Sequence, residues 1–240
     1  KGTRMKSARP KVLHLLAGRS LLQHVLNAAA AEIADRTLVI VGHGADAVRD
    51  STASQPGVQC VLQQPQLGTG HAVLQAVPHL PDTGTTLVLN GDVPLIDPDT
   101  VAALVAACGG ARLALLTVEL ADPTGYGRIV RDGQGRVQAI VEHKDATPAQ
   151  REIREIYSGI LAAPTAWLKR AVTALRNDNA QKEYYLTDIV AAAVAEGLPV
   201  QATLARDETE VLGVNSPLQL ADLERRFQRR QADALMEAGV

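Results

Sequence analysis

Aromatic residues and excess charge of either sign are scarce in this sequence, and each shortage excludes a class of protein. The chain has one Trp, one Phe and four Tyr among 240 residues, so its apolar residues are mainly Ala, Leu and Val. A core of such small side chains favours close contact between helices and a sheet. The 26 acidic and 24 basic residues nearly balance. Charge therefore gives no indication of general binding to nucleic acid or to a membrane surface.

Long apolar runs and paired cysteines are also missing. No run of ~18 apolar residues is present and no signal-peptide pattern occurs, which argues against a membrane protein. Cys60 lies in a strand-like run and Cys108 near the end of a predicted helix, and no Cys/His spacing resembles a zinc site. We interpret both cysteines as buried, reduced thiols of a cytoplasmic protein.

The first half of the chain alternates between strand-like and helical patterns. Asp97 is a suitable N-cap for one of the helices, with Pro98 at its first position. Such alternation predicts an α/β fold with a doubly wound, largely parallel sheet. The predicted strands are 37–41, 58–62, 85–89 and 113–118, and the predicted helices are 21–31, 70–77 and 98–107.

The second half changes character. Two strand-like runs, 127–130 and 137–141, flank the turn sequence DGQG and predict a β-hairpin. We expect this hairpin to form the wall of a second substrate pocket, an expectation by analogy only. A strand at 156–162, helices at 164–175 and 186–196, and a charged terminal helix from Pro217 to Met236, capped by Ser216, complete the prediction. The terminal helix is either a solvated end or a connector to a further domain.

The segment TTLVLNGDVPL is the most informative in the chain, because an apolar run stops at Asn90-Gly91-Asp92. Ligands of open α/β sheets bind beyond such strand ends. A lone Asp there is a suitable Mg²⁺ ligand, although a structural Asx-turn is an equal alternative. Asn215 taken alone reads as a helix N-cap, and it is also able to donate an amide oxygen to a metal held by Asp92.

Three further segments carry groups suited to binding a nucleotide and a sugar. The Gly2 loop offers backbone N–H groups to phosphates, with Arg4 and Lys11 as charged partners, unless this stretch is simply solvated. Gln63 ends a strand, where its amide can pair with a base edge, and the following LGTGH turn lets a base or ribose approach the backbone. His71 in that turn has no evident partner, and we expect it to pack.

Glu142 follows the hairpin and is a suitable acceptor for sugar hydroxyls. Two alternatives stay open from the residues alone: an ordinary solvated turn, and a glycosidase-like pair with Asp145, for which three residues outside a helix give poor geometry. Thr187 lies at the start of a predicted helix, in the sequence EYYLTD.

In order, the motifs resemble the uridylyltransferase domain of the bacterial N-acetylglucosamine-1-phosphate uridylyltransferases, the bifunctional GlmU family. The resemblance covers essentially the whole chain, and the long forms LGTGHA and VEHKDA are its most specific parts. It is carried by K-G-T-R-M-x-S-x-x-P-K-V-L-H, L-Q-x-x-Q-L-G-T-G-H-A, G-D-V-P-L, D-P-T-G-Y-G-R-I, I-V-E-H-K-D, E-Y-Y-L-T-D and E-V-x-G-V-N-S.

This resemblance implies a Rossmann-like nucleotide-diphospho-sugar transferase fold: a mixed, mostly parallel sheet with a β-hairpin insertion. It also implies that UTP and N-acetylglucosamine 1-phosphate are converted to UDP-N-acetylglucosamine and pyrophosphate with Mg²⁺, for peptidoglycan and lipopolysaccharide precursors. The sugar phosphate oxygen is already an anionic nucleophile, so no general base is needed. By position, Arg4 and Lys11 match the family's catalytic residues on the UTP phosphates, and Asp92 and Asn215 match its Mg²⁺ ligands. The uracil contacts of the family correspond to Gln63, Gly68 and Thr69, and its sugar-side contacts correspond to Gly127, Glu142 and Thr187. Further substrate-binding positions are occupied by Gly2, Asn90, Gly91 and Tyr157.

The chain departs from the family at two of these positions. Asn90 stands where well-known members carry Tyr, which affects a contact near the sugar. Tyr157 stands where many members have an Asn that hydrogen-bonds the sugar, and either Ser158 or the Tyr157 hydroxyl is a substitute.

The resemblance also implies domain boundaries. Residues 1–216 correspond to the nucleotidyltransferase domain, and 217–240 to a connector helix to an absent left-handed β-helix. In the family that β-helix acetylates glucosamine 1-phosphate from acetyl-CoA and forms a homotrimer. The family's first strand, which precedes Lys1, is also absent from the sequence. A polypeptide beginning at Lys1 is expected to have poor stability and little activity.

Two other functions compete with this one. The first is nucleotidyl transfer to another sugar phosphate. The second is a non-catalytic nucleotide-sugar binding module, which has no need of both metal ligands and phosphate-binding cations. Neither nucleic acid nor a membrane is an expected partner.

Overall fold

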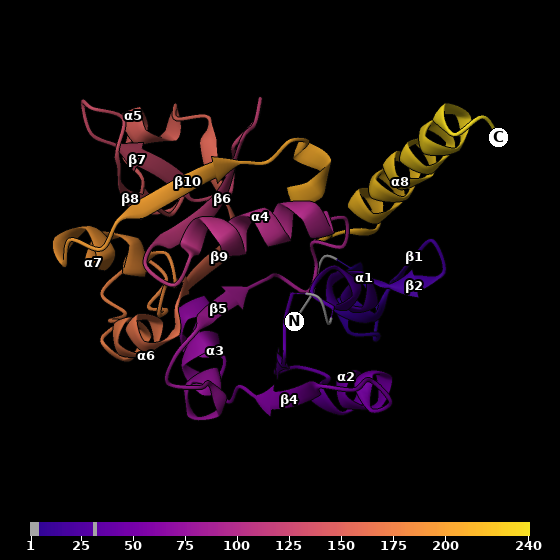
Figure 1. The fold of residues 1–240 in the computed structure, drawn as a ribbon, viewed down its shortest axis with the longest axis horizontal. Helices are drawn as coiled ribbons and strands as arrows, with labels where there is room; N and C mark the ends of the chain where they lie inside the picture. The colour runs from indigo at the N-terminus through magenta and orange to yellow at the C-terminus, as the bar shows by residue number, and fades with distance from the viewer. Residues whose placement is uncertain (1–4, 31–32) are drawn as a thin grey trace.

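The computed structural model describes residues 5–30 and 33–240. Figure 1 shows a main sheet with helices around it, a small pair of strands beside it, and a long terminal helix that projects to one side. The main sheet has six strands in the order β10-β6-β9-β7-β8, with β5 also paired to β9. Its strands are β5 (Thr85–Val88), β6 (Leu113–Glu119), β7 (Arg128–Arg131), β8 (Val137–Val141), β9 (Glu155–Pro164) and β10 (Val200–Leu204).

Strand directions in this sheet are mixed. β10 runs parallel to β6, whereas β9 runs antiparallel to β5, β6 and β7, and β7 and β8 form the predicted antiparallel hairpin. The α/β class, the mixed sheet and the hairpin are therefore confirmed. A predominance of parallel pairs is not found among the described residues, because the ten-residue strand β9 lies between β5 and β6 and reverses the direction on both sides.

A second, two-stranded sheet lies apart from the first. It pairs β3 (Thr37–Val41) in parallel with β4 (Val58–Leu62), both with the predicted bounds. A short antiparallel hairpin near the N-terminus consists of two strands of two residues each, β1 (Leu15–Leu16) and β2 (Arg19–Ser20).

The helices follow the predicted order with small differences at their ends. Asp97 caps α4 as expected, since its side chain accepts a hydrogen bond from Asp99 N at 2.9 Å. The sequence did not predict α2, α5 and β10, nor the short strands β1 and β2 and the 3-10 helices. The helices are α1 (Leu21–Ala28), α2 (Ala45–Thr52), α3 (Thr69–Ala76), α4 (Pro98–Cys108), α5 (Pro148–Arg151), α6 (Thr165–Thr173), α7 (Asp188–Ala195) and α8 (Pro217–Glu237), with short 3-10 helices at Lys11–Leu13, Val77–His79 and Glu208–Val211.

Strand β6 divides the core into two apolar layers. Leu113 and Leu115 face α6 and α7, whereas Ala114 and Leu116 face α4, and all four are fully buried. A strand buried on both faces is apolar at successive positions rather than at alternate ones. This explains why the run beginning at Leu113 was recognisable as a strand.

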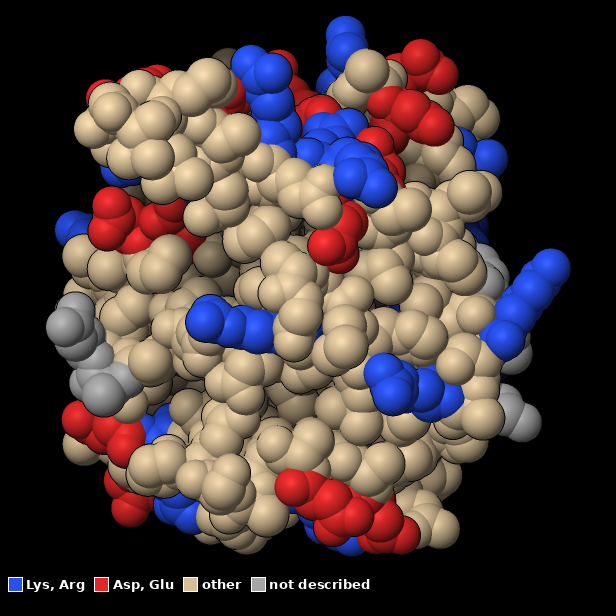
Figure 2. Space-filling view, turned by 90° about the vertical axis from the view of Figure 1, so that its right-hand side faces the viewer, with Lys and Arg blue, Asp and Glu red and all other residues tan. Residues whose placement is uncertain are grey.

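Helix α8 projects from the rest of the molecule (Figure 1). Ser216 caps it, as predicted, by accepting from Gln219 N at 3.2 Å, and Leu223 is its one fully buried residue. Lys, Arg, Asp and Glu are interspersed on the face in Figure 2. Among the described residues, no helix is both long and apolar enough to cross a membrane.

Candidate functional site

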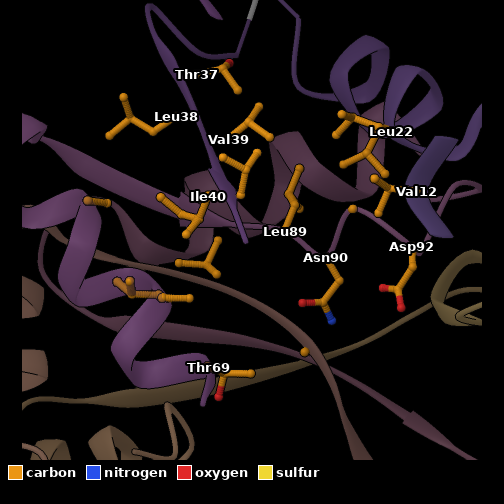
Figure 3. Close-up of a pocket in the computed structure, with 18 of the residues that line it drawn as sticks. Val12, Leu22, Thr37, Leu38, Val39, Ile40, Thr69, Leu89, Asn90 and Asp92 are labelled. Atoms are coloured by element: carbon orange, nitrogen blue, oxygen red, sulfur yellow. The ribbon is translucent and has the colours of Figure 1, made fainter. Parts of the chain in front are cut away.

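A cavity of about 1070 Å³ opens between β3 and β5, with α1 and α3 along its walls (Figure 3). One half is apolar, lined by residues such as Leu38, Ile40 and Leu89. The polar half begins where β5 ends, and there Asn90 and Asp92 project side by side. The end of this strand therefore presents polar groups to the cavity.

Asp92 and Asn215 converge on one cation, the ammonium of Lys11. Lys11 Nζ donates to Asn215 Oδ1 at 2.8 Å and also contacts Asp92 Oδ2. The alternative of Asn215 as a helix cap is excluded, because Ser216 caps α8 and leaves the Asn215 side chain free to face Lys11. The backbone holds the same arrangement, since Val214 N donates to Asp92 O at 2.9 Å.

This cluster has the chemistry that Mg²⁺ requires. A carboxylate oxygen and an amide oxygen already point at a single positive charge, and both are hard ligands that Mg²⁺ prefers. No group of three or more His, Cys, Asp or Glu side chains suited to a metal occurs in residues 5–30 and 33–240. A Mg²⁺ ion held here would therefore complete its shell with water and substrate phosphates, its usual mode in phosphoryl-transfer sites.

Glu142 and Thr187 form a second polar group on another wall. Thr187 Oγ1 donates to Glu142 Oε1 at 3.0 Å, and a Cβ on Gly127 would lie 3.7 Å from Glu142 Oε2. Burial raises the pKa of Glu142, while the Thr187 hydrogen bond lowers it in part. Asp145 is held by other partners, since it accepts from Tyr185 OH at 3.1 Å and from Ala180 N at 3.0 Å.

Asn90 lies against Ser158 and Gly159, the two residues that directly follow Tyr157. Asn90 Nδ2 donates to Ser158 O at 3.4 Å, and it lies where a Cβ on Gly159 would be. Ser158 Oγ donates to Leu116 O at 2.7 Å, so this hydroxyl is occupied within the protein. The Tyr157 hydroxyl is buried without a hydrogen-bond partner in the described part of the chain, and Tyr157 lines the cavity. Of the two expected substitutes, only the Tyr157 hydroxyl therefore lacks a partner within the described residues, and it is buried.

The LGTGH turn packs against the segment before α7, which gives its glycines a structural role. Gly70 N donates to Tyr184 O at 2.8 Å, and Thr69 Oγ1 accepts from Leu186 N at 3.1 Å. A Cβ on Gly68, which has φ +106°, would lie 2.7 Å from Tyr184 O. These glycines therefore allow two protein segments to approach each other.

Only one of the three predicted uracil contacts lines the cavity. Thr69 lines the cavity, whereas Gln63 and Gly68 are not among the residues that do, and Gln63 Nε2 donates to Gly68 O at 3.0 Å. His71 contacts the amides of Gln63 and Gln75, in keeping with the packing role expected for it.

The structure adds residues that the sequence did not single out. Lys6 and Arg9 line the polar end of the cavity, and they belong to the same basic stretch as Lys11. Gln66 also lines it, from the QQPQ sequence beside Gln63. Gly91 and Gly127 line it as predicted, and Gly2 and Arg4 lie outside the described residues.

Known proteins resemble this chain in sequence and in fold. The chain is 65% identical over its whole length to "Bifunctional protein GlmU" of Methylibium petroleiphilum and 61% identical to that of Paracidovorax citrulli. It spans about half of these relatives, 54% and 51% of their lengths. A solved structure titled as UDP-glucose pyrophosphorylase complexed with UDP-glucose has the same fold, with a TM-score of 0.75, 14% identity and 95% coverage of both chains. Residues 1–155 match the model of the MobA-like NTP transferase domain, and the chain belongs to that family.

Proposed function

We propose that this domain transfers the uridylyl group of UTP to N-acetylglucosamine 1-phosphate, releasing pyrophosphate and UDP-N-acetylglucosamine. The observation that carries the proposal is the convergence of Lys11, Asp92 and Asn215 at the polar end of a cavity that also contains the Glu142–Thr187 pair. The first group suits phosphates and the second suits sugar hydroxyls. The high identity to proteins named GlmU supports this choice of substrates.

The reaction needs charge neutralisation and alignment more than proton transfer. An oxygen of the sugar phosphate forms a bond to the α-phosphorus of UTP, and the bond from that phosphorus to the pyrophosphate oxygen breaks. Lys11 stabilises the negative charge on the phosphates, with Arg4 as its predicted partner. Asp92 and Asn215 would hold Mg²⁺, which supplies further positive charge at the phosphates when bound.

The sugar is oriented by the opposite wall. Glu142 accepts hydrogen bonds from sugar hydroxyls, and Thr187 fixes the direction of its carboxylate. Tyr157 supplies a donor that has no partner within the described protein. Asn90, Gly91 and Gly127 complete this side.

The nucleotide base is assigned to the α3 side of the cavity. We retain Thr69 as a uracil contact, and Gln63 and Gly68 as contacts that require the Gln63 amide to turn from Gly68 O toward the base. Gly2 is proposed to bind phosphate through its backbone.

The longer protein has further proposed properties. Residues 1–216 act as the nucleotidyltransferase domain, and 217–240 connect it to an acetyltransferase domain through which the whole protein trimerises. We place the protein in the cytoplasm.

Pyrophosphate release over a substrate panel tests the proposal. UTP with N-acetylglucosamine 1-phosphate is expected to give the highest kcat/KM. A higher value for dTTP with glucose 1-phosphate identifies the competing nucleotidyltransferase. Tight binding of UDP-N-acetylglucosamine with no turnover on any pair identifies the binding module.

A further inference from the structure

Lys11 occupies the position that a metal ion needs. Its Nζ lies 2.8 Å from Asn215 Oδ1 and contacts Asp92 Oδ2. Mg²⁺ binds oxygen ligands at about 2.0–2.1 Å and tolerates little distortion. An ion bound to the same two oxygens would therefore overlap the lysine ammonium, and the two positive charges would also repel each other.

We propose that Lys11 is a placeholder for the divalent cation, which must leave Asp92 and Asn215 before the metal can bind. The proposal rests on the metal site assigned under the proposed function. It concerns an event before catalysis, the exchange of one cation for another at the same oxygens.

The lysine has a reason to hold this position when no metal is bound. The lysine joins distant parts of the sequence, since Lys11 and Asn215 are 204 positions apart. The Lys11 and Asp92 side chains are 24% and 23% exposed, so water solvates the pair only in part. The ammonium keeps the two oxygens directed at one point, which lowers the reorganisation that metal binding requires.

The displaced ammonium needs a new anionic partner. Lys11 lies in a short 3-10 helix at the cavity wall, and its flexible four-carbon stem lets Nζ move without the backbone. The nucleotide phosphates are that partner. Metal and nucleotide therefore bind cooperatively, because each stabilises the arrangement that the other requires.

Metal binding without nucleotide separates this proposal from a purely catalytic role for Lys11. The probe is Mn²⁺, measured by electron paramagnetic resonance on the nucleotide-free protein. Lys11→Met removes the competing charge, and we expect it to tighten Mn²⁺ binding by about tenfold or more while turnover falls. The added substitution Asp92→Asn should abolish that gain.

Lys169→Met is the matched control. Lys169 is also 24% exposed and also pairs with an aspartate, although this aspartate, Asp82, is 95% exposed, and the pair lies outside the cavity. Its Mn²⁺ affinity should equal that of the wild type. If Lys11→Met does not fold, Lys11→Gln serves the same comparison, with the Mn²⁺-induced rise in melting temperature as a second measure of affinity.

The outcomes distinguish the two proposals. Equal or weaker Mn²⁺ binding by the Lys11 variants overturns the placeholder and leaves the uridylyltransferase assay unaffected. Tighter Mn²⁺ binding by these variants supports the placeholder. If the wild-type protein also shows no turnover with any nucleotide and sugar phosphate, the proposed function is overturned while the placeholder stands.

Discussion

Thr187 Oγ1 donates a hydrogen bond to Glu142 Oε1 at 3.0 Å, joining two residues 45 positions apart. The bond connects the start of α7 to the segment after β8, and both residues line the cavity. It orients a carboxylate whose pKa is raised by burial. At neutral pH, burial of this carboxylate therefore carries a cost to stability.

The raised pKa of Glu142 predicts that its contribution to the stability of the folded protein depends on pH. Because the pKa of Glu142 is raised in the folded state, folding favours the protonated acid. This contribution to stability is present below the pKa of Glu142 in the unfolded chain, and it is lost as the pH rises through the pKa in the folded state. Glu142→Gln mimics the neutral acid and should raise the melting temperature at pH 7.5. The gain should disappear at a pH below both pKa values. A gain that is independent of pH would contradict this explanation.

Thr187→Val should weaken sugar binding selectively. The substitution removes the hydroxyl that orients Glu142 while keeping the shape of the side chain. We expect KM for N-acetylglucosamine 1-phosphate to rise about tenfold, the value of one hydrogen bond, with KM for UTP unchanged. Thr173→Val, at an exposed hydroxyl that donates to Lys169 O on α6, is the control. Equal increases in both KM values would show that Thr187 does not act on the sugar side.

Asp92→Asn should separate binding from chemistry. The amide keeps the size of the side chain but loses the charge that holds the metal. We predict a fall in kcat of at least about 100-fold with a modest loss of nucleotide affinity. Steady-state rates and calorimetric binding of UTP provide the two measurements. Near-normal turnover would exclude Asp92 as a metal ligand.

Gly68→Ala should destabilise the protein more than Gly84→Ala, because only the new Cβ at position 68 clashes with another segment. Gly68 has φ +106°, and a Cβ there would lie 2.7 Å from Tyr184 O. The conformation and the overpacking together should cost about 2–4 kcal/mol. Gly84 has φ +96° with open space around it, so Gly84→Ala should cost only about 1–2 kcal/mol. Denaturant unfolding of both variants measures the difference, and equal losses would reject the clash.

Local pattern was sufficient for most of the fold. β3 and β4 have the predicted bounds, and the Asp97 cap and the β7–β8 hairpin were also predicted. The direction of β9 was not predictable from such patterns, because an apolar run carries no information about which neighbours it pairs with. α2 contains mostly polar and small residues, ADAVRDST, so its apolar periodicity is weak.

The site was predictable in part, and for similar reasons. Motif order indicated Asp92 and Asn215, but only the folded chain shows that both face Lys11. The packing of the LGTGH turn against Tyr184 was not predictable, because Tyr184 is far away in sequence. Tyr157 became the stronger candidate at its position once the structure paired Ser158 with Leu116.

A crystal structure of the complex with Mg²⁺ and UDP-N-acetylglucosamine would show whether this cavity is a uridylyltransferase site. We predict the metal between Asp92 and Asn215, Lys11 Nζ on the diphosphate, and sugar hydroxyls within hydrogen-bond distance of Glu142. A metal away from Asp92, or uridine on the Glu142 wall with the sugar near α3, would contradict the account.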